Sequence, residues 1–156
     1  MKDKPLVSIV IVCMNRPDNL FPCLESIRAN TQNVDYETIV VAYRFSPDNL
    51  AKSKAAFPWV TFIESNEIRG FSENNNIALK TVKGDFCFVV NDDTEMHMDV
   101  VGKLVSDFSK LPSEAAIITP KLLNADGSLQ LCGRPDYPAR YYIMQQWHVH
   151  REAVDD

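Results

Sequence analysis

The sequence of 156 residues has no C-x-x-C pair and no apolar run long enough to cross a membrane. Its four cysteines, Cys13, Cys23, Cys87 and Cys132, lie far apart, which argues against a zinc site and against a disulfide framework. The apolar residues 6–12 are too few for a membrane span and lack the cleavage site of a signal peptide. We therefore expect reduced thiols in a cytoplasmic protein that meets a membrane at most peripherally, at its cytoplasmic face.

An excess of positive charge is also missing. The chain has 16 basic and 21 acidic residues, a formal net charge of −5, which argues against a broad nucleic-acid-binding surface. Glycine-rich phosphate loops are absent, because neither G-x-G-x-x-G nor G-x-x-x-x-G-K-[ST] occurs. The serine turn G-x-S-x-G is absent too. The sequence therefore indicates no nucleic-acid partner and excludes dinucleotide-dependent dehydrogenases, P-loop enzymes and α/β-hydrolases.

What the sequence does contain is a regular alternation of apolar runs and amphipathic segments. The apolar runs predict five strands, and an amphipathic segment that Asp99 would cap predicts one of the helices between them. Alternating strands and helices indicate right-handed crossovers, and hence an α/β fold with a mainly parallel sheet flanked by helices. The pair Asp126-Gly127 predicts a β-hairpin near the carboxyl end. The predicted strands are residues 6–12, 37–41, 59–64, 86–90 and 115–119.

Polar residues follow the first and the fourth predicted strands directly. If strand one is central, with strands two and three on one side and strand four on the other, the strand order reverses between strands one and four. Ligands bind such open sheets at the carboxyl ends of the strands beside that reversal. Asn91, Asp92 and Asp93 supply oxygen ligands there, which Mg²⁺ and Mn²⁺ prefer. The alternative is a polar turn in which Asp93 caps the following segment.

Four segments, in order, resemble the family-2 glycosyltransferases. Residues 5–16 resemble the opening strand and its Thr-Tyr-Asn-Arg turn, and Gly70-Phe71 with Asn75-Asn76 resembles the Gly-Phe…Asn-Asn helix start. Residues 84–94 resemble the segment that carries the Asp-x-Asp-like metal motif. Residues 120–130 resemble the Pro-Lys-Leu…Asp-Gly-Ser segment of rhamnosyltransferase-like members. The resemblance covers roughly residues 5–135.

The resemblance implies a GT-A (Rossmann-like) fold that binds a nucleoside-diphosphate sugar. Residues 1–135 would be this donor-binding domain, the amino-terminal portion of the enzyme, and residues 136–156 a truncated element or tail. The sugar would pass with inversion to a glycan or lipid-linked acceptor, assisted by Mg²⁺ or Mn²⁺. Asp93 would be the metal ligand. The implied nucleotide-sugar-binding residues are Cys13, Asn15, Arg16, Ala42, Tyr43, Gly70, Asn75, Asn76, Asn91 and Asp92.

The sequence departs from the family's pattern in two places. Ala42 stands where the family has an aspartate that contacts the nucleobase, so base discrimination should be weak unless Tyr43 or Arg44 substitutes for it. The family's acceptor region and catalytic base lie beyond the matched segments, so we expect no sugar transfer by this chain alone. The alternatives are a non-catalytic nucleotide-binding or interaction module and, third, a nucleotidyltransferase, which would need a glycine-rich basic loop after strand one.

Overall fold

Strands and helices alternate strictly along the first part of the chain. The computed structural model describes residues 5–130. The tail expected at residues 136–156 and Cys132 lie outside these residues. None of the described helices is long and apolar enough to span a membrane. The elements are β1 (Leu6–Cys13), α1 (Pro17–Asn30), β2 (Asp35–Tyr43), α2 (Pro47–Ala56), β3 (Val60–Ser65), α3 (Phe71–Leu79), β4 (Phe86–Asn91) and α4 (Val100–Phe108).

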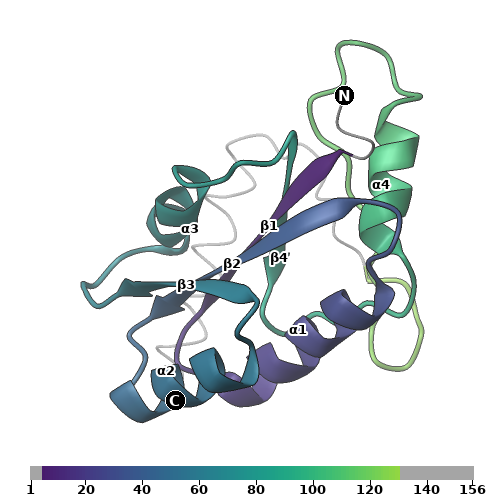
Figure 1. Cartoon of the computed structure of the whole chain (residues 1–156). Helices are drawn as coiled ribbons and strands as arrows, with labels where there is room; N and C mark the ends of the chain where they lie inside the picture. Colours follow the sequence, from purple (N-terminus) through teal and green to yellow (C-terminus); the bar gives the residue numbers. More distant parts are fainter. Residues whose placement is uncertain (1–4, 131–156) are drawn as a thin grey trace, which may run out of the picture. The chain divides into compact units, whose positions relative to one another are not determined.

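The four strands form one parallel sheet in the order β3-β2-β1-β4 (Figure 1). Cys13 at the end of β1 is level with Ala42 of β2, and Val12 is level with Asn91 of β4. The strand order expected from the sequence is therefore confirmed, with β1 in the centre and the reversal between β1 and β4. Because all four strands are parallel, their carboxyl ends meet at one edge of the sheet.

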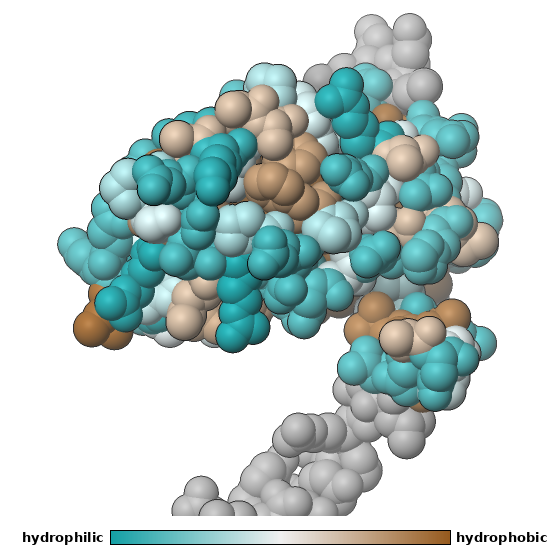
Figure 2. Space-filling model, turned by 90° about the horizontal axis from the view of Figure 1, so that it is seen from below, coloured by the Kyte–Doolittle hydropathy of each residue, from teal (hydrophilic) through white to brown (hydrophobic). Residues whose placement is uncertain are grey.

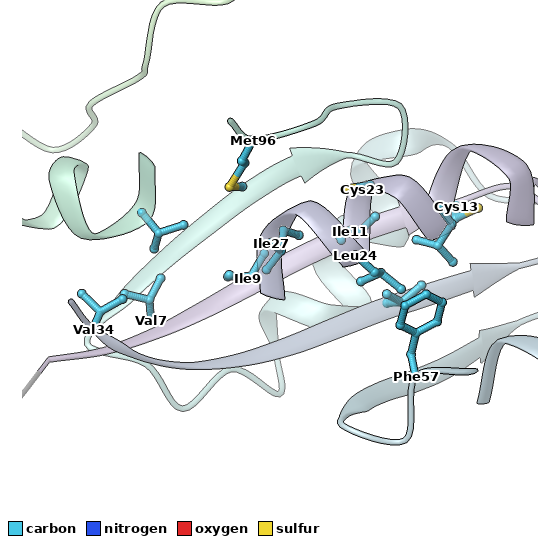
Figure 3. Packing of buried hydrophobic residues seen from close by; sticks show 13 residues of the cluster. Val7, Ile9, Ile11, Cys13, Cys23, Leu24, Ile27, Val34, Phe57 and Met96 are labelled. Atoms are coloured by element: carbon cyan, nitrogen blue, oxygen red, sulfur yellow. The ribbon is translucent and has the colours of Figure 1, made fainter. Parts of the chain in front are cut away.

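The core lies on both faces of β1, which explains its unbroken apolar sequence. On one face Ile9 and Ile11 pack under Leu24 and Ile27 of α1 (Figure 3). On the other face Val10, level with Ile39 of β2, belongs to a smaller cluster with Ala78 of α3. Helices α1 and α3 therefore cover opposite faces of the sheet (Figure 1).

Strand β4 is buried on one face only. Phe86, Phe88 and Val90 pack against the α1 side of the core, whereas Cys87 and Val89 are exposed. This alternation is typical of a strand with one uncovered face. Within the described residues β4 pairs only with β1.

The chain divides into two compact units, residues 1–118 and the residues from 119 on. In the second unit Leu123 and Leu129 form an antiparallel bridge, and Gly127 adopts φ 82° in the connecting turn. The turn predicted at Asp126-Gly127 is therefore present. The strand predicted at residues 115–119 is wrong, because this segment has no partner strand among the described residues and Ile117 is 86% exposed.

Candidate functional site

Four loops open on the edge where the strands end. Five of the site residues singled out from the sequence lie in these loops, and four more end the strands that lead into them. A parallel sheet brings residues together in this way even when they are far apart in the chain. The loops are residues 14–16 after β1, 44–46 after β2, 66–70 after β3 and 92–99 after β4.

Asn15 links the loop after β1 to the loop after β2. Its Oδ1 accepts a hydrogen bond from the backbone N–H of Ser46 (3.0 Å) and another from Nδ2 of Asn49 (2.9 Å). Its backbone has φ 52°, a left-handed conformation that asparagine tolerates better than most residues. The side-chain oxygen of Asn15 therefore shapes the edge of the sheet.

The loops after β2 and β3 are tied together in a similar way. The backbone N–H of Arg44 donates to the carbonyl of Ser65 (2.8 Å), and the hydroxyl of Tyr43 accepts from the backbone N–H of Arg69 (3.3 Å). The side chain of Ala42 is buried, as is that of Cys13 beside it in β1. Of these two predicted residues, only the backbone can take part in binding a ligand at the edge.

The loop that carries the acidic residues is anchored to α1 near both of its ends. At the start, the thiol of Cys23 donates to the carbonyl of Asn91 (3.6 Å). Further along, the N–H of Met96 donates to Oγ of Ser26 (3.0 Å), and Nδ2 of Asn30 donates to the carbonyl of Met96 (2.7 Å). These contacts fix the part of the loop that lies between them.

Asp99 completes this anchoring and caps α4, as the sequence predicts. Its carboxylate accepts from the N–H of Gly102 (3.0 Å) and from Nδ2 of Asn33 (2.6 Å), which follows α1. Partial burial alone would raise the pKa of Asp99, but the hydrogen bonds from Asn33 and from the backbone outweigh burial and hold that pKa below its usual value.

The two aspartates of the acidic loop have different surroundings. Asp92 is half-buried near the thiols of Cys13 and Cys23. Burial, and then the negative charge of Asp92, raise the pKa of Cys23 to about 12. Burial and a hydrogen bond to Asp92 also raise the pKa of Cys13. Both thiols are therefore protonated at neutral pH, which argues against a role as nucleophiles.

Asp93 is exposed, and among the described residues its carboxylate has no hydrogen-bond or ion-pair partner. The helix cap on this segment is Asp99. The alternative in which Asp93 serves as a structural cap therefore has no support in the structure. An exposed carboxylate on an anchored loop can bind a ligand without losing an internal contact.

The donor set at this edge fits a metal ion only in part. Among the described residues no three His, Cys, Asp or Glu side chains come together as a metal cage. Asp93, with Asp92 and Asn91 next to it, offers one or two carboxylates and an amide oxygen. Mg²⁺ and Mn²⁺ accept such hard oxygen ligands, and Mg²⁺ commonly completes its shell with water and substrate phosphates. The residues therefore fit a metal shared with a phosphate ligand.

The start of α3 holds three predicted residues and one that the sequence did not reveal. Gly70 donates its N–H to Glu73 Oε2 (2.7 Å), and Asn76 is exposed. Asn75 is buried and donates to the carbonyl of Phe71 (3.0 Å), and its Oδ1 has no hydrogen-bond partner within residues 5–130. The residue that was missed is Asn74, which is 1% exposed and accepts from Oγ of Ser65 (2.8 Å).

A hollow of about 470 Å³ lies between the starts of α1 and α2. Asn15 and Arg16 line it, but none of the acidic residues after β4 does. The carboxyl edge therefore has a hollow beside the ends of β1 and β2 and an acidic loop beside the end of β4. Figure 2 shows the molecule from below, and hydrophilic residues surround a smaller apolar patch on the face that it shows. The lining residues are Asn15, Arg16, Pro17, Asp18, Asn19, Phe21, Asn49 and Lys52.

Solved structures resemble this chain in fold. The mannosyltransferase PcManGT from Pyrobaculum calidifontis, solved with GDP-Man and Mn²⁺, is 19% identical, with a TM-score of 0.55 over 63% of this chain and 30% of that one. S. aureus TarS 1-349 is 18% identical, with a TM-score of 0.53 over 67% of this chain and 32% of TarS. TarS has also been solved with UDP, with a TM-score of 0.55 at 16% identity and the same coverage. The fold is therefore of the GT-A type.

Sequence comparisons agree with the fold. An uncharacterized protein, y4gI, of Sinorhizobium fredii is 28% identical over 145 residues, which are 85% of this chain and 15% of that protein. The chain thus spans about a third of the structures it resembles and a smaller part of this relative. Residues 8–130 match the sequence model of glycosyl transferase family 2. This match covers most of the chain, which therefore belongs to glycosyl transferase family 2.

Proposed function

We propose that this chain binds the sugar donor of a glycosyl transfer, a nucleoside-diphosphate sugar, across the carboxyl edge of its sheet. The observation that carries the proposal is Asp93, an exposed carboxylate on an anchored loop beside the strand-order reversal, with no partner in the described part of the chain. GDP-Man with Mn²⁺ in PcManGT and UDP in TarS, two proteins that share this fold, support a nucleotide ligand of this kind.

The order of the strands indicates how the donor would be oriented along the edge. Adjacent strands lie about 4.8 Å apart, so the end of β2 is roughly 10 Å from the end of β4, with β1 between them. A diphosphate beside Asp93 at β4 would place the nucleoside over the ends of β1 and β2. Asn15, Arg16 and Tyr43 would border it there, and the sugar would extend from the other end of the diphosphate.

Asp93 would hold Mg²⁺ or Mn²⁺ together with the donor's phosphates, and Asn91 and Asp92 would line the diphosphate and ribose. The bound ion would stabilise the negative charge that develops on the departing nucleoside diphosphate. The carboxylate of Asp93 offsets the charge of the ion, and the anchors on α1 keep it in place. A hydroxyl of a glycan or lipid-linked acceptor would attack the anomeric carbon as the bond to the nucleoside diphosphate breaks, with inversion. The proton of that hydroxyl would pass to the catalytic base, which the family carries beyond the matched segments.

A calorimetric titration tests the proposal. The 156-residue chain is titrated with GDP and with UDP, first in Mn²⁺ and then in a chelator. We expect at least one of the two to bind more tightly in Mn²⁺, because the ion needs phosphate oxygens to complete its shell. The matching nucleosides, which lack phosphates, are the control and should gain nothing from Mn²⁺. Absence of binding by every nucleoside diphosphate would contradict the proposal.

A further inference from the structure

Arg44 has an unusual backbone conformation at the end of β2. Like Asn15, it has φ 52°, and these two are the only non-glycine residues with positive φ in the described chain. They hold equivalent positions, since each lies two residues beyond the level pair Cys13 and Ala42. Asparagine accepts this conformation readily, whereas a long side chain seldom adopts it.

Contacts on both sides hold Arg44 in this conformation. Its own N–H is bonded to the carbonyl of Ser65 in β3, and the N–H of Ser46 is bonded to Oδ1 of Asn15. Such strain persists only where the surroundings impose it, and it clusters at ligand-binding sites. The fold therefore fixes the backbone of Arg44 at the carboxyl edge.

The guanidinium of Arg44 is exposed and has no hydrogen bond or ion pair among the described residues. Arg69, in the neighbouring loop, differs because it is paired with Glu67. The residue before Tyr43 is the buried Ala42, which brings no carboxylate. The end of β2 therefore presents the hydrogen-bond donors of Arg44, and position 42 supplies no carboxylate that would pair with them.

We propose that Arg44 reads the nucleobase of the donor and selects guanine. This inference rests on the proposed function, which places the nucleoside over the ends of β1 and β2. In open sheets of this kind the end of the second strand is a common place for contacts to the nucleoside, and the charge found there selects between ligands. Arg44 occupies that place with a free guanidinium.

Guanine is the base that matches an arginine fork best. Its O6 and N7 are two neighbouring acceptors that a guanidinium binds with two parallel hydrogen bonds. Adenine has an acceptor and a donor at the same positions, and uracil has an N–H between its two carbonyl groups. Lysine keeps the charge of arginine but loses the planar fork. Exchange of Arg44 for lysine therefore separates recognition of the base from simple attraction to phosphate.

The experiment measures dissociation constants for GDP, UDP, CDP, ADP and inorganic pyrophosphate in Mn²⁺. We expect the wild-type chain to bind GDP roughly 10- to 100-fold more tightly than the other nucleotides, the range of one good bidentate contact to a base. Arg44→Lys should remove most of this preference by weakening the binding of GDP, while the affinities for UDP and pyrophosphate change little. The matched control is Lys83→Gln, which removes a charge between α3 and β4, away from the carboxyl ends, and should leave the preference intact.

Three results would overturn the inference while leaving the proposed function standing. The first is binding without preference for GDP, and the second is a preference for GDP that Arg44→Lys does not alter. The third is an equal loss of GDP, UDP and pyrophosphate binding in Arg44→Lys, which would make Arg44 a phosphate contact. Absence of binding by every nucleotide would instead remove the proposed function and this inference together. Unfolding midpoints of the variants identify any loss of binding that comes from loss of the fold.

Discussion

The side chain of Asn15 offers a direct test of how the carboxyl edge is built. Its Oδ1 holds the loop after β2 through two hydrogen bonds, and its backbone is left-handed. Three replacements separate these contributions. Asn15→Asp keeps an acceptor oxygen, Asn15→Gly keeps the backbone freedom but loses the oxygen, and Asn15→Ala loses both.

The structure sets the expected magnitudes. A hydrogen bond contributes about 0.5–1.5 kcal/mol, and because Asn15 is exposed to water its two bonds together contribute roughly 1 kcal/mol. Replacement by glycine adds up to about 1 kcal/mol to the loss of stability, because glycine makes the unfolded chain more flexible. Replacement by alanine adds roughly 1–2 kcal/mol to the loss of stability, because alanine is strained in the left-handed conformation. We expect losses of about 1–2 kcal/mol for Asn15→Gly and about 2–3 kcal/mol for Asn15→Ala, with Asn15→Asp close to the wild type.

Urea unfolding followed by far-UV circular dichroism measures these losses as shifts of the midpoint at constant slope. Glycine more destabilising than alanine would refute the strain argument. Aspartate as damaging as glycine would refute the role of the oxygen.

Two further predictions concern the packing of β1 against β4 and the cap on α4. A Cβ at Gly84 would lie 2.5 Å from the backbone N of Ser8 and 2.6 Å from the carbonyl O of Phe86, so Gly84→Ala must push β1 and β4 apart. It should cost about 1–3 kcal/mol in urea unfolding, and a loss below about 0.5 kcal/mol would contradict this packing. Asp99 has a lowered pKa, so its contribution is fully present above the unfolded-state pKa of about 3.9 and is lost as the pH falls through the lower folded-state value. Asp99→Ala should therefore cost about 0.5–2 kcal/mol at neutral pH and less near pH 2, and a loss independent of pH would contradict the capping role.

The parallel sheet could be predicted from the sequence because the apolar runs are long and the helices between them force crossovers. The run at residues 115–119 misled for the same reason. Its β-branched residues indicate a tendency to form a strand, but a strand also needs a partner, and Ile117 remains exposed. A sequence pattern records the tendency alone.

The candidate site also has features that could be predicted from the sequence and features that could not. The positions of Asn15 and Asp93 could be predicted, because polar residues that end buried strands must lie at the carboxyl edge. The partners of Asn15 could not, since Ser46 is 31 residues away in the chain and the bond depends on the register of β1 with β2. Asn74 gave no signal either, because a buried asparagine in a helix is recognised only when its partner is seen, here Ser65 at the end of β3.

The central claim is that Asp93 binds a divalent cation together with the diphosphate of a nucleotide. The direct measurement is the affinity of Asp93→Asn for GDP and UDP, in Mn²⁺ and in a chelator. Asp35→Asn, which removes an equal charge at the opposite edge of the sheet, is the control. We predict a fall of about tenfold or more in Mn²⁺ for Asp93→Asn, and in chelator no change or a small gain, because a carboxylate that repels the phosphates has gone. Equal losses in Mn²⁺ and in chelator would contradict the claim and make Asp93 a structural residue.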